Sequence, residues 1–403
     1  MPSVKNTELG EALSRLIPSE ESGSYVSSDY ISAESAKELF GDRMVMTQTK
    51  FEKYQDCPLS YYLRHVLHLD EGEVAKVSYV DVGNFVHKIL EDILGEIKEE
   101  GNVYPFDEDK IKERTGALIE KYISTVMPEG ETGGRHGYLF SRVRRSLDIY
   151  LKSLNREFSV SEFKPEAFEL SVGQKDSTIP SLEVPLSDGS VMAMCGTVDR
   201  VDLYRGVSNV YVRVADYKTG SKTFNLAKAL EGRNIQLLLY LFSICEAKGS
   251  EFAKKVCPNG ERLVPAGAVY FSALPGQVVT TSPVKGIEAE ETTINDISRT
   301  GIALGEKSII LAMDPDNTGK YCPVKITAKG EVGAGGKSEE QMEEIKDALC
   351  DAMRRVGDKM RSGCAAAIPE INGNKSPCSY CRMRPVCRIE NNNAEREEAD
   401  HGD

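Results

Sequence analysis

Residues 191–218, VMAMCGTVDRVDLYRGVSNVYVRVADYK, carry the pattern that is most informative about the fold of this chain. Two runs within it, 191–203 and 210–217, alternate apolar and polar side chains toward the period of two that is typical of a β-strand. Turn-forming residues such as Gly206 and Ser208 separate the two runs. The sequence therefore predicts a β-hairpin of two antiparallel strands.

Charged residues stand where the second predicted strand ends. Asp216 and Lys218 are two residues apart, so their side chains leave the same face of the sheet. Asp199 lies on the partner strand and can reach the same point. Two carboxylates and a lysine suit phosphodiester hydrolysis, because carboxylates hold Mg²⁺, the metal activates a water, and the lysine orients that water or offsets negative charge. An Asp-x-Lys pair alone is also typical of a solvated turn.

Helical patterns flank the hairpin on both sides. Residues 82–94 place apolar side chains at the spacing of an amphipathic helix, and this helix carries His87. Residues 235–242 read as a buried helix on which Gln236 and Tyr240, four positions apart, share a face. Further helices are predicted at 107–125, 138–155 and 338–361, and a further strand at 266–274. The order of elements predicts an α/β fold.

Four cysteines predict a metal centre apart from the hairpin. Cys378, Cys381 and Cys387 have C-x2-C-x5-C spacing, and Cys57 stands alone far ahead of them. Three thiolates near one point need a fourth ligand to complete a four-thiolate site, and Cys57 is the candidate. Either zinc or an iron-sulfur cluster satisfies this pattern. Such a site would join the two ends of the folded region.

The composition limits the class of protein. The 403 residues are 40% apolar and carry a net charge of -13, with no apolar run long enough to span a membrane. The first thirty residues lack a secretory signal, so we expect a cytoplasmic globular protein. The acidic balance argues against a protein that coats nucleic acid. A local basic patch at Arg142, Arg144 and Arg145 is either a DNA contact or a solvated helix face.

Taken in order, the motifs resemble those of a known family. Gly196 to Asp199, then Asp216-Tyr217-Lys218, then Gln236 to Tyr240 resemble successive motifs of the RecB-like branch of the PD-(D/E)XK nucleases. His87 is similar to the helix-borne histidine of that branch, which is a metal ligand in the family. A lone histidine beside an apolar stripe is usually structural, but the position of His87 before the hairpin favours a metal ligand. The resemblance implies a central mixed sheet flanked by helices. It also implies Mg²⁺ ligands at His87, Asp199 and Asp216, a catalytic lysine at Lys218, and further catalytic roles for Gln236 and Tyr240.

The cysteine pattern resembles the iron-sulfur staple of AddB-type subunits of bacterial helicase-nucleases. That resemblance implies a [4Fe-4S] cluster on Cys57, Cys378, Cys381 and Cys387, and Mg²⁺-dependent exonuclease digestion of the 5′-terminated DNA strand in double-strand-break repair and recombination, with an AddA-type partner. AddB-type subunits carry a helicase-like region that is not seen here, so we expect a fragment or a free-standing relative.

Alternatives are a CRISPR-associated type of single-strand exonuclease and a non-catalytic iron-sulfur module that binds DNA ends. We expect a polar leader at 1–46, the nuclease domain at 47–388 and a disordered acidic tail at 389–403.

Overall fold

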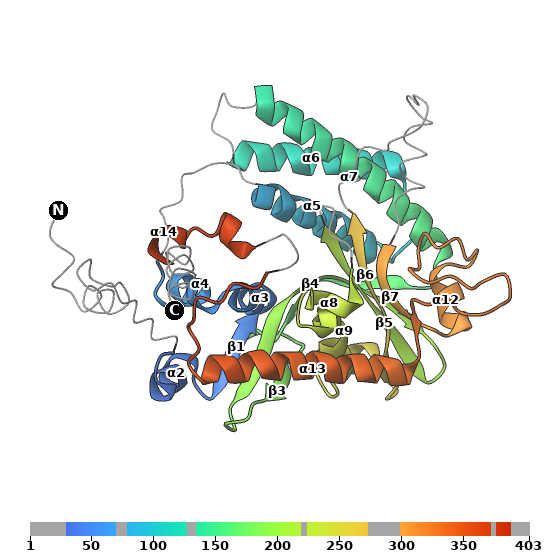
Figure 1. The fold of residues 1–403 in the computed structure, drawn as a ribbon. Helices are drawn as coiled ribbons and strands as arrows, with labels where there is room; N and C mark the ends of the chain where they lie inside the picture. Colours follow the sequence, from blue (N-terminus) through green and yellow to red (C-terminus); the bar gives the residue numbers. More distant parts are fainter. Residues whose placement is uncertain are drawn as a thin grey trace. The chain divides into compact units, whose positions relative to one another are not determined.

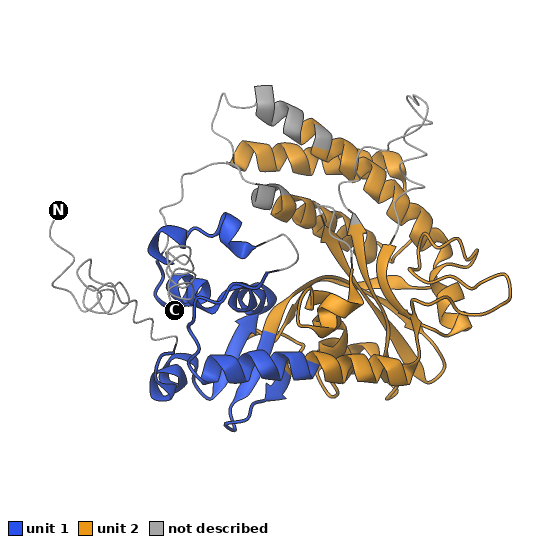
Figure 2. Ribbon diagram, in the orientation of Figure 1, with its two compact units in different colours: residues 1–73, 183–194, 350–403 blue, residues 74–182, 195–349 orange. Residues whose placement is uncertain are grey.

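The computed structural model describes residues 30–69, 79–126, 134–218, 224–272, 299–371 and 376–387 (Figure 1). The chain divides into two compact units, which Figure 2 shows in different colours. Unit 1 takes residues 1–73, 183–194 and 350–403, and unit 2 takes residues 74–182 and 195–349. The nuclease domain predicted over 47–388 includes residues of both units.

Unit 2 is built on a mixed β-sheet. Its strands are β2 (Lys164–Val172), β4 (Val191–Arg205), β5 (Asn209–Lys218), β6 (Arg262–Ser272), β7 (Arg299–Leu304) and β8 (Gly336–Lys337). β4 pairs antiparallel with both β2 and β5, and β7 pairs antiparallel with β6. β5 and β6 are parallel, as are β7 and β8. The predicted hairpin is confirmed as β4 and β5, and the predicted mixed sheet is confirmed with it.

Helices cover both faces of this sheet. They are α5 (Tyr79–Glu99), α6 (Glu108–Val126), α7 (Gly134–Val160), α8 (Leu226–Leu230), α9 (Gln236–Glu246), α10 (Glu251–Val256), α12 (Lys307–Met313) and α13 (Glu339–Arg361), the last of which continues into unit 1. In Figure 1, α5, α6 and α7 stack over one face and α9 lies on the other. The predicted helices at 82–94, 107–125, 138–155, 235–242 and 338–361 are confirmed.

The apolar pattern of α5 explains why that helix forms and where it packs. Its buried side chains recur at helical spacing, from Phe85 through Leu90 to Ile97. They join apolar residues of α6 and α7 in one core cluster, which also includes Tyr217 and Phe271 from β5 and β6. Burial of these faces holds the three helices on the sheet and fixes the position of His87 above the end of β5.

Unit 1 gathers segments that are distant in the sequence. Its elements are α2 (Ala33–Phe40), β1 (Arg43–Thr47), α3 (Gln48–Asp56), α4 (Pro58–Tyr61), the π-helical turn η2 (Tyr62–Val66), β3 (Leu182–Pro185), the first residues of β4, the end of α13, η3 (Pro377–Tyr380) and α14 (Arg384–Cys387). Backbone hydrogen bonds join α3 and α4 to the segment after α13: Leu59 N donates to Ala366 O at 3.1 Å, and Glu370 N donates to Asp56 O at 3.0 Å.

The predicted leader ends earlier than residue 46. β1 begins at Arg43 and pairs with β4, and Met44 and Met46 are buried. Along β1, exposed and buried residues alternate, so the strand contributes one apolar face to the core. The leader before residue 30 and the tail at 389–403 lie outside the described residues. Within the described part of the chain, no helix is long and apolar enough to cross a membrane.

Candidate metal and phosphodiester site

The candidate site lies in unit 2, where β4 and β5 separate. The backbone register of the hairpin runs from Arg205 opposite Val210 to Arg200 opposite Ala215. Past this last pair, the Tyr217 N–H donates to the side chain of Asp199 instead of to a backbone acceptor on β4, at 2.7 Å from Oδ2. The two strands therefore part at the position where both predicted carboxylates stand.

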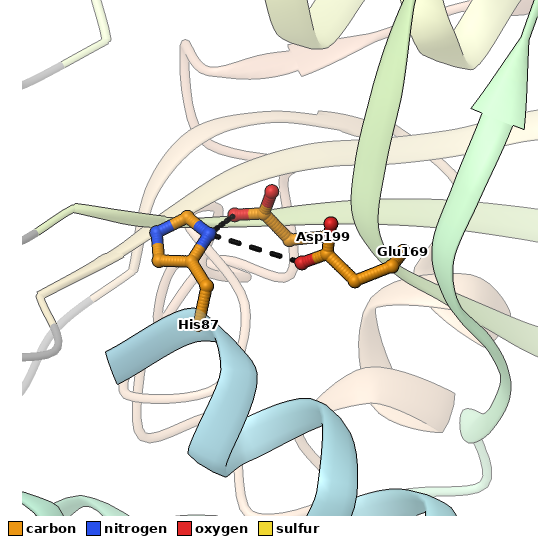
Figure 3. A group of neighbouring side chains, drawn as sticks. All are labelled: His87, Glu169 and Asp199. Carbon is orange, nitrogen blue, oxygen red and sulfur yellow. Dashed lines mark ion pairs between the residues drawn. The ribbon is translucent and has the colours of Figure 1, made fainter. Parts of the chain in front are cut away.

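His87 reaches this gap from α5. Its Nε2 lies 2.8 Å from the backbone oxygen of Tyr217, and a carbonyl can only accept, so Nε2 carries the proton. Nδ1 then points at the acidic side chains, 3.4 Å from Asp199 Oδ2 and 3.9 Å from Glu169 Oε1 (Figure 3). Burial lowers the pKa of His87, but hydrogen bonding and the charge of Asp199 outweigh burial and raise it. This orientation of an imidazole is the one that a metal ligand requires.

Glu169 is a member of this group that the sequence analysis missed. Phe168 pairs with Arg200 and Leu170 pairs with Val198, so Glu169 stands opposite Asp199 on the neighbouring strand. Its φ is 44°, a left-handed conformation that is costly for a residue with a side chain. His87, Glu169 and Asp199 each bring a ligand atom within 4.8 Å of the others. They form a ready set of oxygen and nitrogen donors for a cation.

The carboxylates of the site crowd one another. Asp216 is 2% exposed, and burial followed by the charge of Asp199 raises its pKa to about 7. Burial and the same Asp199 charge raise the pKa of Glu169 to about 7. Like charges in a poorly solvated place repel one another, and a divalent cation would relieve the repulsion. The donor set therefore fits Mg²⁺ or Mn²⁺.

Lys218 completes the predicted constellation. Its Nζ lies 2.5 Å from Asp216 Oδ2 and donates to Gln236 Oε1 at 3.3 Å. The Tyr240 hydroxyl instead accepts the Thr197 N–H at 3.2 Å, and burial raises its pKa to about 12, so the hydroxyl stays neutral. The structure thus links Asp216, Lys218 and Gln236 by successive contacts, whereas Tyr240 bonds the backbone of β4.

A buried ionic network lies in the same sheet. Asp202 pairs with Arg200 at 2.9 Å and with Arg213 at 2.8 Å, while Glu157 pairs with Arg213 at 2.8 Å and with Arg299 at 2.6 Å. All five side chains are fully buried or nearly so. Because each charge has opposite charges beside it, the network holds β4, β5, β7 and α7 in one arrangement.

The network contacts the candidate site through Tyr217. The Arg200 guanidinium donates to the Tyr217 hydroxyl at 3.3 Å and lies 5.6 Å from the centre of that ring. The backbone of the same tyrosine bonds His87 and Asp199, as described above. The core of unit 2 therefore fixes the residue that holds two of the candidate ligands.

The four predicted cysteine ligands meet in unit 1. Cys57 joins α3 to α4, and Cys378, Cys381 and Cys387 lie in and around η3 and α14. All four line a single cavity of about 400 Å³. Burial and the nearby thiols of Cys387 and Cys381 raise the pKa of Cys57, despite backbone hydrogen bonds that lower it. Four sulfur donors around one cavity fit a metal-thiolate group.

The predicted basic patch lies on α7. Arg144 and Arg145 are exposed, whereas the side chain of Arg142 lies outside the described residues. The Arg144 guanidinium lies against α6, because a Cβ placed on Gly116 would be 2.2 Å from its Nη2. A contact of this patch with DNA stays a prediction.

Comparisons with known proteins agree with the geometry. Residues 45–388 match the model of the PD-(D/E)XK nuclease superfamily. The chain is 28% identical over 374 residues to the B subunit of the ATP-dependent helicase/deoxyribonuclease of Clostridium acetobutylicum, covering 90% of this chain and 31% of that protein. It is 29% identical over 365 residues to the corresponding protein of Symbiobacterium thermophilum, covering 89% of this chain and 31% of that protein.

This chain spans about a third of the length of these curated relatives. The family match takes in the hairpin, the helix that carries His87 and the helix that carries Gln236. It also takes in all four cysteines of the unit 1 cavity. This chain therefore belongs to the PD-(D/E)XK nuclease superfamily.

Proposed function

We propose that this chain is the nuclease domain of an AddB-type subunit, a Mg²⁺-dependent exonuclease that digests the 5′-terminated DNA strand during double-strand-break repair and recombination. An AddA-type helicase-nuclease would deliver that strand. The observation that carries the proposal is the convergence of His87, Asp199, Asp216 and Lys218 where β4 and β5 part. The names of the similar proteins support DNA as the substrate and a helicase assembly as the setting.

The chain's own residues divide the work of hydrolysis. His87, Glu169, Asp199 and Asp216 would hold the cation, which when bound polarises the scissile phosphate and activates a water. Lys218 stands beside Asp216 and is held there by Gln236, so its ammonium can orient the attacking water and offset charge that grows on the phosphate. A non-catalytic DNA-end-binding module would need neither the lysine nor the crowded carboxylates.

We propose that the four cysteines bind a [4Fe-4S] cluster. Four thiolates can hold either a single zinc ion or an iron-sulfur cluster. Two observations support the cluster: the four cysteines line one cavity of about 400 Å³, and their pattern resembles the iron-sulfur staple of AddB-type subunits. Broad visible absorbance after anaerobic purification would support iron, and a colourless protein with stoichiometric zinc would exclude it.

Digestion of single-stranded DNA that carries a label at one end tests the proposed activity. With Mg²⁺, the wild-type chain should release nucleotides, and Asp216→Ala or Lys218→Ala should reduce the rate by at least about a thousandfold without unfolding the protein. Asp176→Ala and Lys175→Ala, at an exposed turn of the same unit, are matched controls that should keep the wild-type rate. Undiminished digestion by either site variant would refute the catalytic assignment.

A further inference from the structure

Helix α9 contacts strand β4 at a place where the strand lacks its hairpin partner. The register of β4 with β5 ends at Arg200, and the Thr197 N–H donates instead to the Tyr240 hydroxyl at 3.2 Å. On the other edge of β4, Thr197 pairs with Ser171 of β2. The strand segment just before Asp199 is therefore held between β2 on one edge and a single side chain from α9 on the other.

This contact requires a glycine. A Cβ on Gly196 would lie 2.1 Å from the Tyr240 hydroxyl oxygen, 2.9 Å from Cζ and 3.0 Å from Cε1. Tyr240 is 5% exposed, and every residue of α9 from Leu237 to Cys245 is buried. A rigid ring on a fully packed helix cannot swing aside as a lysine end would. A residue with a side chain at position 196 would therefore clash with Tyr240.

The same helix also holds the lysine of the site. Gln236 stands one turn before Tyr240, and its Oε1 accepts a hydrogen bond from the Lys218 ammonium at 3.3 Å. Through these two contacts, α9 fixes the position of the strand that carries Asp199 and the position of the Lys218 amine beside Asp216. Asp199 lies three residues after Gly196 on β4, and β2 pairs with the strand along this segment. A shift of β4 by a few tenths of an ångström at Gly196 would therefore also move Asp199.

We propose that Gly196 and Tyr240 form a positioning pair that sets where Asp199 presents its carboxylate to the bound cation. Tyr240 acts on the β4 backbone and does not contact the substrate. This inference rests on the proposed function, since it assigns the pair to the metal site of that reaction. It gives the glycine and the tyrosine one shared role, although they stand 44 residues apart in the chain.

The test is a double-substitution cycle read by Mn²⁺ affinity, measured by titration calorimetry on the full chain, with Asp199→Ala as the blank that lacks the site. Gly196→Ala should weaken Mn²⁺ binding by at least about tenfold, and Tyr240→Phe by several-fold. In the Tyr240→Phe background, Gly196→Ala should weaken Mn²⁺ binding by a smaller factor than in the wild type. Phenylalanine removes the 2.1 Å contact with the hydroxyl oxygen and leaves only the ring carbons, at 2.9 and 3.0 Å. Gly95→Ala, where a Cβ meets open space, and Tyr211→Phe are controls that should leave affinity unchanged.

Kinetics on an oligonucleotide separate positioning from substrate contact. Tyr240→Phe should lower kcat and leave KM within about twofold of wild type. The proposed pair would be refuted if both single variants bound Mn²⁺ with wild-type affinity. It would also be refuted if the loss of affinity in the double variant equalled the product of the losses in the two single variants. A raised KM with unchanged Mn²⁺ affinity would likewise refute the pair and assign Tyr240 to the substrate. Wild-type Mn²⁺ binding without DNA digestion would refute the proposed function alone, because the coupling is read from metal affinity.

Discussion

Replacing Glu169 with glutamine removes one negative charge from the group around His87 and keeps the volume of the side chain. Because Glu169 lies among the candidate cation ligands, the change should raise the Mg²⁺ concentration for half-maximal digestion by roughly tenfold. A Mg²⁺ titration of nucleotide release measures it. Glu231→Gln, at an exposed position of the same unit, is the control. An unchanged Mg²⁺ requirement would remove Glu169 from the site.

At the scale of residues, motif spacing predicted most of the candidate site. Asp216 and Lys218 share a face by strand geometry alone, and the order of motifs along the chain added His87 and Asp199. Glu169 was not predicted, because its position opposite Asp199 depends on the pairing register of β2 with β4. Spacing along the chain does not specify that register. The sequence also predicted that Tyr240 shares a helix face with Gln236. Its contact with Thr197 could not be predicted, because it depends on how closely the Tyr240 ring packs against Gly196.

At the scale of elements, the ionic network in the sheet carries a stability prediction. Glu157→Gln removes a fully buried charge that faces Arg213 and Arg299 and leaves their positive charges less compensated. The free energy of unfolding should fall by about 3–5 kcal/mol, measured by urea denaturation. The exposed pair of Glu100 and Lys110 supplies the control, since Glu100→Gln should leave the free energy of unfolding nearly unchanged.

The loss of stability caused by Glu157→Gln should depend on pH. Although burial raises the pKa of Glu157, the surrounding arginines lower it from 4.5 to about 2. A carboxyl with a depressed pKa in the folded state contributes stability above its unfolded pKa and loses it as pH falls through its folded pKa. The difference in unfolding free energy between wild type and Glu157→Gln should therefore narrow as pH falls from 4.5 toward 2. If the difference in unfolding free energy stayed constant between pH 4.5 and pH 2, Glu157 would not be a charged member of the buried network.

Element boundaries were harder to predict than element types. Strand β6 was predicted to start at residue 266, but it begins at Arg262 and includes Pro265. The register with β5 slips there, from Val212 opposite Pro265 to Arg213 opposite Gly267, so one extra residue forms a bulge. Proline ordinarily argues against a central strand, and a bulge is the irregularity that admits it. Such local exceptions depend on the partner strand, which the sequence of β6 alone does not specify.

At the scale of the whole molecule, the two units carry different chemistry, with carboxylates and a lysine at the site of unit 2 and four cysteine thiols around the cavity of unit 1. Cys57→Ala should loosen unit 1, because metal binding by ligands far apart in sequence contributes to folding free energy. Limited proteolysis with mass mapping should show cleavage within residues 30–69, 350–371 and 376–387 at least about tenfold faster than in wild type. Cys257→Ala, which lies outside the cysteine cavity, is the control. Equal protection of the Cys57 variant would argue against a metal staple.

The proposed nuclease requires that a divalent cation bind where β4 and β5 part. Anomalous diffraction from crystals of the full chain soaked in Mn²⁺ would locate that cation. We predict a manganese peak within coordination distance, about 2.0–2.3 Å, of a ring nitrogen of His87 and of carboxylate oxygens of Asp199 and Asp216. A peak at any other group of side chains, with none beside these three, would contradict it.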